Sequence, residues 1–197
     1  MRDLGKITVS PKTGEECLFF DGKNVGKNLI DFWKWSVSDL LSNATRGTFA
    51  EFIVATAVGI SFSKIREEWS AFDLITDTGI KIEVKSSAYL QSWNQKDYSK
   101  IVFSIKESHY WDSDSNKQSI NKYRPSDVYV FCLLDHKEKS SVNPLNLNQW
   151  KFYVLNTKRI NEYKRSKHSI TLKSLEKLTN SIKYNELKMR IKEEFKK

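Results

Sequence analysis

An alternation of apolar and charged residues near the middle of the chain constrains the fold more than any other feature. In residues 80–85, isoleucine or valine alternates with lysine or glutamate. This period of two predicts a strand with one apolar and one polar face. Phe72 to Ile75 form a second strand-like run, and Asp77-Thr78-Gly79 between the runs suits a short loop whose glycine is left-handed. The sequence therefore predicts a β-hairpin.

The register of this hairpin brings like charges together. If Thr76 pairs with Ile80, Asp73 lies directly opposite Glu83, an arrangement that destabilises a strand pair. Two carboxylates about 5 Å apart repel by roughly 3 kcal/mol at an effective dielectric constant near 20. A divalent cation between them would turn this repulsion into binding energy. Lys85 points to the same face and could hold a water molecule or a phosphate oxygen beside the metal.

A charged solvent-facing strand would show the same alternation, so the pattern has a purely structural alternative. The Glu-x-Lys pattern also begins at Glu162, Glu186 and Glu194. Only the copy at residues 83–85 follows a hairpin that carries an opposed aspartate. That context, and not the short pattern, favours a functional site.

A second acidic residue of interest lies in an apolar helix. Thr48 to Ser63 are predicted to be helical and are apolar nearly all round, with Glu51 as their only charge. Burying an unpaired carboxylate costs several kcal/mol. A structural explanation is a capping box in which Thr48 caps the helix and Glu51 reaches back to its amide, with Arg46 as a further partner. Neither contact excludes a role for Glu51 in a metal site.

The succession of these residues resembles the PD-(D/E)XK nuclease superfamily, the fold of many restriction endonucleases and DNA-repair nucleases. A helix with Glu51, then Asp73, then Glu83-Val84-Lys85 carry the resemblance. It spans about residues 45–93 by motif and extends to about residue 157 by its succession of strands. Phe72 stands where the motif has proline. The resemblance implies a restriction endonuclease-like α/β fold, with a mixed central β-sheet flanked by helices.

The resemblance also implies a role for each matching residue. Asp73 and Glu83 would bind magnesium, for which manganese would substitute, and the backbone carbonyl of Val84 would be a further ligand. Lys85 would assist the attack of water on the phosphodiester, and Glu51 would be an accessory ligand or would position the water. Phosphodiester hydrolysis needs a nucleophile and charge stabilisation at phosphorus, and a hard cation held by oxygen ligands supplies both.

Two further residues are candidate contacts with substrate. In several branches of the superfamily a glutamine after the lysine strand positions substrate, which makes Gln91 a candidate, although an ordinary loop amide would look the same. Arg46, close to Glu51 in the sequence, is the second candidate. No competing metal site is expected, because the cysteines are far apart and the histidines lack ligand spacing; these residues are Cys17, Cys132, His109, His136 and His168.

The net charge of +9 is unevenly distributed over the 197 residues. Residues 1–150 hold 19 Lys and Arg and 19 Asp and Glu, whereas residues 151–197 hold 14 and 5. The basic C-terminal segment 151–197 either binds phosphates or is a solvated lysine-rich tail. Two cysteines make no disulfide framework, and no leader or membrane-length apolar run is visible. We expect one cytoplasmic nuclease-like domain over residues 1–197, without membrane association.

The remaining patterns predict the scaffold. Lys6–Val9 and Glu16–Phe20 suggest an N-terminal hairpin around Pro11-Lys-Thr-Gly14, and Leu29–Leu41 an amphipathic helix. Glu107–Ser126 reads as a long polar connection. Further strands are expected at Ile101–Lys106, Asp127–Leu134 and Trp150–Asn156, and further helices at Leu172–Leu178 and Tyr184–Phe195.

The sequence thus predicts a magnesium-dependent endonuclease that hydrolyses DNA and acts in restriction, phage defence or repair. RNA or branched DNA are alternative targets, and a homodimer would suit double-strand cutting. Two other classes of function remain open. A non-catalytic nucleic-acid-binding module would use the basic C-terminal segment, and a protein-interaction subunit would use the aromatic N-terminal helix.

Overall fold

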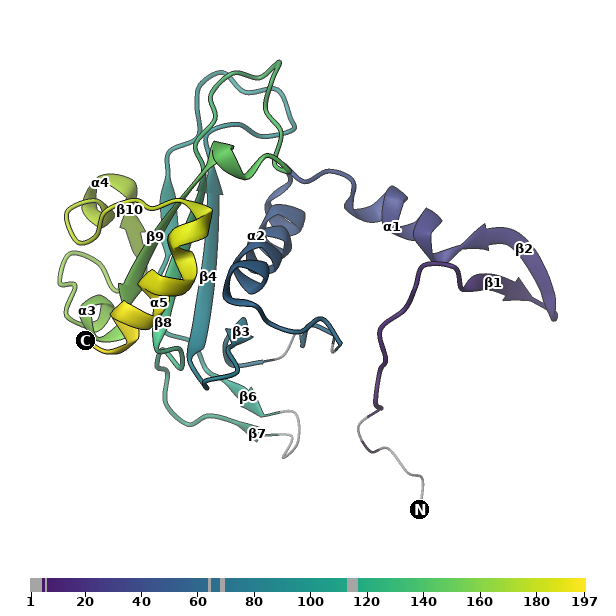
Figure 1. Cartoon of the computed structure of the whole chain (residues 1–197), viewed down its shortest axis with the longest axis horizontal. Helices are drawn as coiled ribbons and strands as arrows, with labels where there is room; N and C mark the ends of the chain where they lie inside the picture. Colours follow the sequence, from purple (N-terminus) through teal and green to yellow (C-terminus); the bar gives the residue numbers. More distant parts are fainter. Residues whose placement is uncertain (1–4, 6, 64, 68–69, 113–116) are drawn as a thin grey trace.

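A computed structural model describes residues 5, 7–63, 65–67, 70–112 and 117–197. At its centre lies a four-stranded sheet in the order β3-β4-β8-β9. The strands are β3 (Leu74–Ile75), β4 (Lys81–Ala88), β8 (Val128–Leu134) and β9 (Trp150–Asn156). Strands β4 and β8 are parallel and the other two pairs are antiparallel. This mixed sheet with helices around it (Figure 1) confirms the predicted fold class.

The hairpin of β3 and β4 forms in the predicted register. Leu74 pairs with Ile82, and the amide of Thr76 donates to the carbonyl of Ile80 at 3.0 Å. Gly79 has φ +84°, the left-handed conformation expected of it. Strand β3 is shorter than the predicted run from Phe72, but the amide of Asp73 still donates to Ile82 at 3.1 Å.

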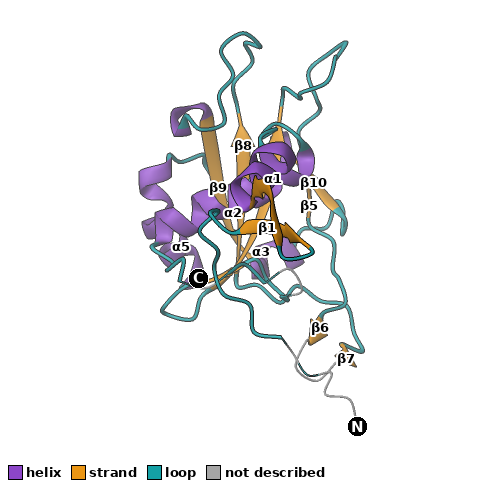
Figure 2. Ribbon diagram, turned by 90° about the vertical axis from the view of Figure 1, so that its right-hand side faces the viewer, coloured by secondary structure: helices purple, strands orange, loops and turns teal. Residues whose placement is uncertain are grey.

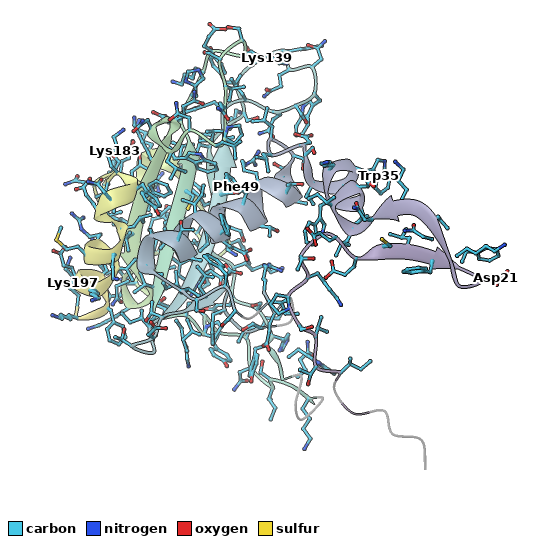
Figure 3. All side chains as sticks on the ribbon, turned by 45° about the vertical axis from the view of Figure 1, so that its right-hand side comes forward. Asp21, Trp35, Phe49, Lys139, Lys183 and Lys197 are labelled. Carbon is cyan, nitrogen blue, oxygen red and sulfur yellow. The ribbon has the colours of Figure 1, made fainter. Side chains whose placement is uncertain are left out.

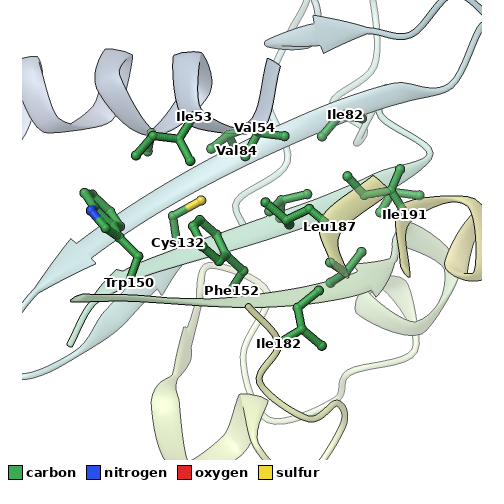
Figure 4. Packing of buried hydrophobic residues seen from close by; sticks show 14 of the residues in the cluster. Ile53, Val54, Ile82, Val84, Cys132, Trp150, Phe152, Ile182, Leu187 and Ile191 are labelled. Atoms are coloured by element: carbon green, nitrogen blue, oxygen red, sulfur yellow. The ribbon is translucent and has the colours of Figure 1, made fainter. Parts of the chain in front are cut away.

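One face of the sheet is covered by two helices, α2 (Asn43–Val58) and α5 (Leu187–Phe195). We call this side of the sheet the helical face. On it, even-numbered residues of the strands pack against the two helices in an apolar core (Figure 4). Ile82, Val128 and Phe152 are fully buried there against Ile53 of α2 and Ile191 of α5. The sequence periodicity of β4 places Glu83 and Lys85 on the reverse side.

The reverse side, which we call the site face, packs against the other short elements. Odd-numbered residues such as Tyr129, Phe131 and Leu155 form a second apolar core. The layer over them contains β5 (Val102–Ser104) paired with β10 (Ser169–Thr171), and the helices α3 (Thr157–Asn161) and α4 (Leu172–Leu175). Figure 2 shows α5 and the β5–β10 pair on opposite sides of β8.

An N-terminal arm projects from this body (Figure 1). It comprises β1 (Cys17–Phe20), β2 (Lys23–Asn28) and α1 (Leu29–Val37). No residue of α1 is buried, and Trp35, far from the sheet in Figure 3, is 84% exposed. The prediction that Lys6–Val9 pair with Glu16–Phe20 is wrong, although Lys6 itself lies outside the described residues. Cys17–Phe20 pairs with the next segment because Asp21-Gly22 forms a two-residue turn with φ 48° and 71°.

Several predicted helix boundaries also need correction. The Glu51 helix begins at Asn43, not Thr48, and ends at Val58, where left-handed Gly59 caps it. Helix α1 ends at Val37 rather than Leu41, and α4 ends at Leu175 rather than Leu178. The polar connection 107–126 carries a small hairpin of β6 (Trp111–Asp112) and β7 (Lys117–Gln118).

Short 3-10 turns complete the described chain, η1 (Leu147–Gln149) before β9 and η2 (Tyr184–Glu186) before α5. Among the described helices, none has the length and apolar character needed to cross a bilayer.

Candidate active site

The four residues predicted to carry the chemistry come together beside β4. Glu83 and Lys85 lie on β4, Asp73 immediately precedes β3, and Glu51 lies on α2. Their charges act on one another. Burial raises the pKa of Glu83 above its ordinary value, Lys85 opposes this shift, and Asp73 adds to it. The pKa of Glu51 is likewise raised by burial, with an added contribution from Asp73.

Asp73 is anchored on the backbone of β4. Its Oδ2 accepts a hydrogen bond of 2.7 Å from the amide of Val84. In an antiparallel pair, a residue presents its amide and its carbonyl to the same side. The carbonyl of Val84 therefore faces the side of β4 on which the Asp73 carboxylate lies. The regular pairing ends at Leu74 and Ile82, and the amide of Asp73 donates to the carbonyl of Ile82, so the strand register does not extend to a pair of Asp73 with Glu83. The bond to Val84 nevertheless brings Asp73 near enough to Glu83 for its charge to raise the pKa of that carboxyl.

The carboxylate of Glu83 accepts hydrogen bonds from an ammonium group and from a hydroxyl group. Its Oε1 accepts a hydrogen bond of 2.5 Å from Nζ of Lys85, and its Oε2 accepts one of 3.2 Å from Oγ of Ser126. Burial by itself would lower the pKa of Lys85, but the attraction of Glu83 and Asp73 raises it above the ordinary value. The ammonium group of Lys85 is therefore charged at neutral pH.

Glu51 is held by an arginine, Arg66, that no sequence pattern indicates as a partner. Both of its carboxylate oxygens accept hydrogen bonds from Arg66, Oε2 from Nε and Oε1 from Nη2 at 3.0 Å. The predicted capping box is wrong, because Thr48 lies inside α2, where its hydroxyl donates to the carbonyl of Ala44 at 3.4 Å. Ser42 is the residue at the N-cap position.

Arg46 and Gln91, the two predicted substrate contacts, are hydrogen-bonded to each other. Nη1 of Arg46 donates to Oε1 of Gln91 at 3.1 Å, and the two residues are only 3% and 4% exposed. Arg46 also donates to the carbonyl of Leu41 and to Oδ1 of Asn43, both at 2.6 Å. Burial lowers the pKa of Arg46. The pair joins the start of α2 to the segment after β4. In the part of the chain that the structure describes, Arg46 forms no hydrogen bond or ion pair with Glu51.

The donor set of this site fits a hard divalent cation. Asp73 and Glu83 offer carboxylate oxygens near enough for their charges to interact, and Val84 offers a carbonyl. Within the described ranges, no three His, Cys, Asp or Glu side chains gather into a complete metal cage. Magnesium does not require one, because it commonly binds through one or two carboxylates and keeps several waters.

Three neighbours of the site went unnoticed in the sequence. Ser126 bonds to Glu83, Arg66 bonds to Glu51, and Tyr129 lies opposite Glu83 in the β4–β8 register. Burial, followed by the charge of Glu83, raises the pKa of the Tyr129 hydroxyl. The position of Ser126 directly before the predicted strand 127–134 is the one sequence feature that could have indicated it as a neighbour of the site. Only the parallel pairing of β4 with β8 brings it to Glu83.

Comparison with known families gives one informative result. The family model described as bacteriophage T4 endonuclease IV matches residues 27–174, more than half of the chain. The matched range includes Glu51, Asp73, Glu83 and Lys85 and ends before α5. The search of curated proteins gives no match.

Proposed function

The chain belongs to the bacteriophage T4 endonuclease IV family, and we propose that it hydrolyses phosphodiester bonds of DNA with the help of a divalent cation. The observation that supports the metal dependence is that the carboxylate of Asp73, bound to the amide of Val84, lies near Glu83, which in turn holds the ammonium group of Lys85. We propose further that the site is of the restriction endonuclease-like type. Restriction, phage defence and repair are all roles that such an endonuclease would serve.

Asp73, Glu83 and the carbonyl of Val84 would hold the cation, which we propose to be magnesium, with manganese as a substitute. When bound, a cation of this kind supplies an activated water and neutralises charge on the phosphate. In the absence of a cation, burial and then the negative charge of Asp73 raise the pKa of Glu83. Their arrangement therefore favours binding of positive charge.

Lys85 acts as a cation and hydrogen-bond donor in this proposal. Its raised pKa keeps the ammonium charged at neutral pH, so it is not available to remove a proton from water. Nζ is held beside Glu83 and can donate to a phosphate oxygen that carries growing negative charge.

Two further residues would support the site. Ser126 positions Glu83 by donating a hydrogen bond to its second carboxylate oxygen, Oε2. Glu51, paired with Arg66, is an accessory group that would orient water at the edge of the site.

The test is cleavage of DNA by the purified protein and by three matched variants. Asp73→Asn, Glu83→Gln and Lys85→Met should each lower the cleavage rate by at least about 10²–10³-fold, the usual cost of removing one group that stabilises developing charge. Chelation of divalent cations should abolish cutting, and manganese should restore it. Single- and double-stranded DNA, branched DNA and RNA, supplied in parallel, identify the target.

Lys81→Met is the control for these variants. Lys81 lies on the same strand and the same face as Lys85, but its side chain is exposed and its ammonium stacks on the ring of Phe72 at 5.6 Å. This variant should cut DNA as the unmodified protein does. Circular dichroism and denaturant midpoints must show that all variants are folded. Undiminished cutting by Lys85→Met, or cutting that survives chelation, would contradict the proposal.

A further inference from the structure

We propose that a basic cleft beside α3 binds phosphates of the DNA backbone and so positions the strand that enters the active site. The cleft has a volume of about 510 Å³. Four cationic residues line it, Arg159, Lys164, Arg165 and Lys177, against one acidic residue, Glu162. The inference rests on the proposed nuclease function and adds a binding site to it.

Three of these four cations are available to a ligand. Within the described residues, Lys164, Arg165 and Lys177 form no ion pair. Arg159 has a structural part, because its Nη2 donates to the carbonyl of Leu178 at 2.6 Å and its Nη1 lies 3.9 Å from Oε2 of Glu194. The cleft thus has one fixed wall and several exposed charges without acidic partners, which suits an anionic ligand.

The central sheet divides the positive charge of the C-terminal segment into two sets. Lys188, Arg190 and Lys192 belong to α5, which packs on the helical face. The cleft residues surround α3 and α4, which pack on the site face. Glu83 and Lys85 point to that same face, since they pair in register with Tyr129 and Phe131. Of these two sets of cations, the one at the cleft shares a side of the sheet with the site.

Two hydrogen bonds connect the cleft to the candidate active site. Ser126 donates through Oγ to Glu83 at 3.2 Å, and its carbonyl accepts from Oγ1 of Thr157 at 2.6 Å. Thr157 is the first residue of α3, and the cleft begins two residues later at Arg159. A nucleic-acid strand with one phosphate at Lys85 could therefore extend along the site face towards the cleft.

The ligand expected from this geometry is the sugar–phosphate backbone, independent of base sequence. Lysine and arginine bind phosphates as charge donors, and such contacts fix the position of the strand without reading its bases. Each neutralised phosphate releases counterions, so the number of contacts can be counted from the salt dependence of binding.

The experiment measures DNA binding without divalent cations, so that it does not depend on cleavage. The full-length double variant Lys164→Gln/Arg165→Gln is compared with Lys188→Gln/Lys192→Gln, which loses the same charge from α5. Fluorescence anisotropy with a labelled oligonucleotide should show a Kd raised on the order of tenfold for the cleft variant, with the slope of log K against log salt reduced by about 2. The α5 variant should change Kd less than twofold.

Cleavage kinetics give a second readout. With magnesium, kcat/KM of the cleft variant should fall mainly through a higher KM, as expected of a group that binds substrate and transition state equally. Equal loss of affinity in both double variants, or no loss in either, would overturn the inference. If the protein binds DNA through the cleft but never cuts it, the nuclease proposal fails and the cleft stands. If it cuts DNA and the cleft variant binds normally, only the cleft fails.

Discussion

The two faces of strand β4 are made of alternate residues of one short run, yet they contribute differently to the protein. Ile82 and Val84, on the helical face, are 0% and 6% exposed and pack in the core beneath α2. On the site face, the side chains of Glu83 and Lys85 are 17% and 30% exposed. One face removes apolar surface from water, and the other holds charges where water is scarce.

This difference teaches how a small domain can hold a charged site. Burial of apolar groups stabilises the fold by about 25 cal/mol per Å². Burial of Glu83 opposes folding, because it raises the pKa of that carboxyl and so disfavours its ionised form. We infer that the helical face provides the stability and the site face the chemistry. Neighbouring residues on β4 should therefore separate the two properties.

The largest effect is expected from a substitution on the helical face. Ile82→Ala should lower the free energy of unfolding by about 2–5 kcal/mol, because it leaves a cavity beneath α2. Urea denaturation measures this loss, and Lys81→Ala next to it should change stability by less than about 1 kcal/mol. At low temperature the folded fraction of Ile82→Ala should still cut DNA. A stable Ile82→Ala protein that has lost cleavage would show that the two faces are not separable.

A smaller effect is expected where the hydrogen bond between Arg46 and Gln91 joins α2 to the segment after β4. Gln91→Ala removes one acceptor from the buried guanidinium of Arg46 and should cost about 1–3 kcal/mol of stability. Chemical denaturation measures this loss, and cleavage kinetics of the folded variant show whether KM changes. Gln91→Glu, which restores an acceptor, should recover part of the stability. Normal stability together with a raised KM would instead favour the substrate contact that the sequence predicted for Gln91.

Local features of the fold could be predicted from the sequence. The β3–β4 hairpin was found because alternation and a glycine at the turn lie within a dozen residues. The Asp21-Gly22 hairpin carried an equally strong turn signal, but the flanking residues of β2, Lys23–Asn28, show no apolar alternation and so concealed the strand. The early start of α2 was missed because Asn43 to Gly47 are polar or small, and their helical state depends on packing.

The candidate site was predictable only in part. Asp73, Glu83 and Lys85 are close in sequence, and Glu51 is conspicuous as the single charge of an apolar stretch. Ser126 reaches Glu83 from 43 positions away through a parallel strand pair, which no local pattern specifies. The basic cleft was hidden in the overall charge of the C-terminal segment. Only the sheet reveals which of its cations share a face with the site.

The pH dependence of stability tests the cost of the charged face. Without divalent cations, a carboxyl whose folded pKa is raised binds more protons in the folded than in the unfolded protein. Its contribution to stability is complete below the ordinary pKa of 4.5 and is lost as pH rises through the folded pKa. Stability should therefore fall with pH in that window more steeply for the unmodified protein than for Glu83→Gln.

For one proton, the slopes of the two curves of stability against pH cannot differ by more than about 1.4 kcal/mol per pH unit. Thermal or urea denaturation at pH 4 to 8 measures both curves, and the difference cancels the contributions of other groups. Parallel curves would mean that Glu83 is not destabilised by its surroundings. Magnesium should flatten the curve of the unmodified protein alone, because a cation bound at Glu83 favours the ionised carboxylate.

The smallest effect is expected in the N-terminal arm, which has neither a covering layer nor a charged site. Trp35→Ser should change the free energy of unfolding by less than about 0.5 kcal/mol, because Trp35 is 84% exposed. Trp33→Ser is the matched variant. The ring of Trp33 lies so close to Gly14 that a Cβ added there would be 2.9 Å from it, so its loss should loosen the arm. If Trp35→Ser instead lowers the melting temperature by an amount that depends on protein concentration, the outer face of α1 is buried between two copies, as a homodimer requires.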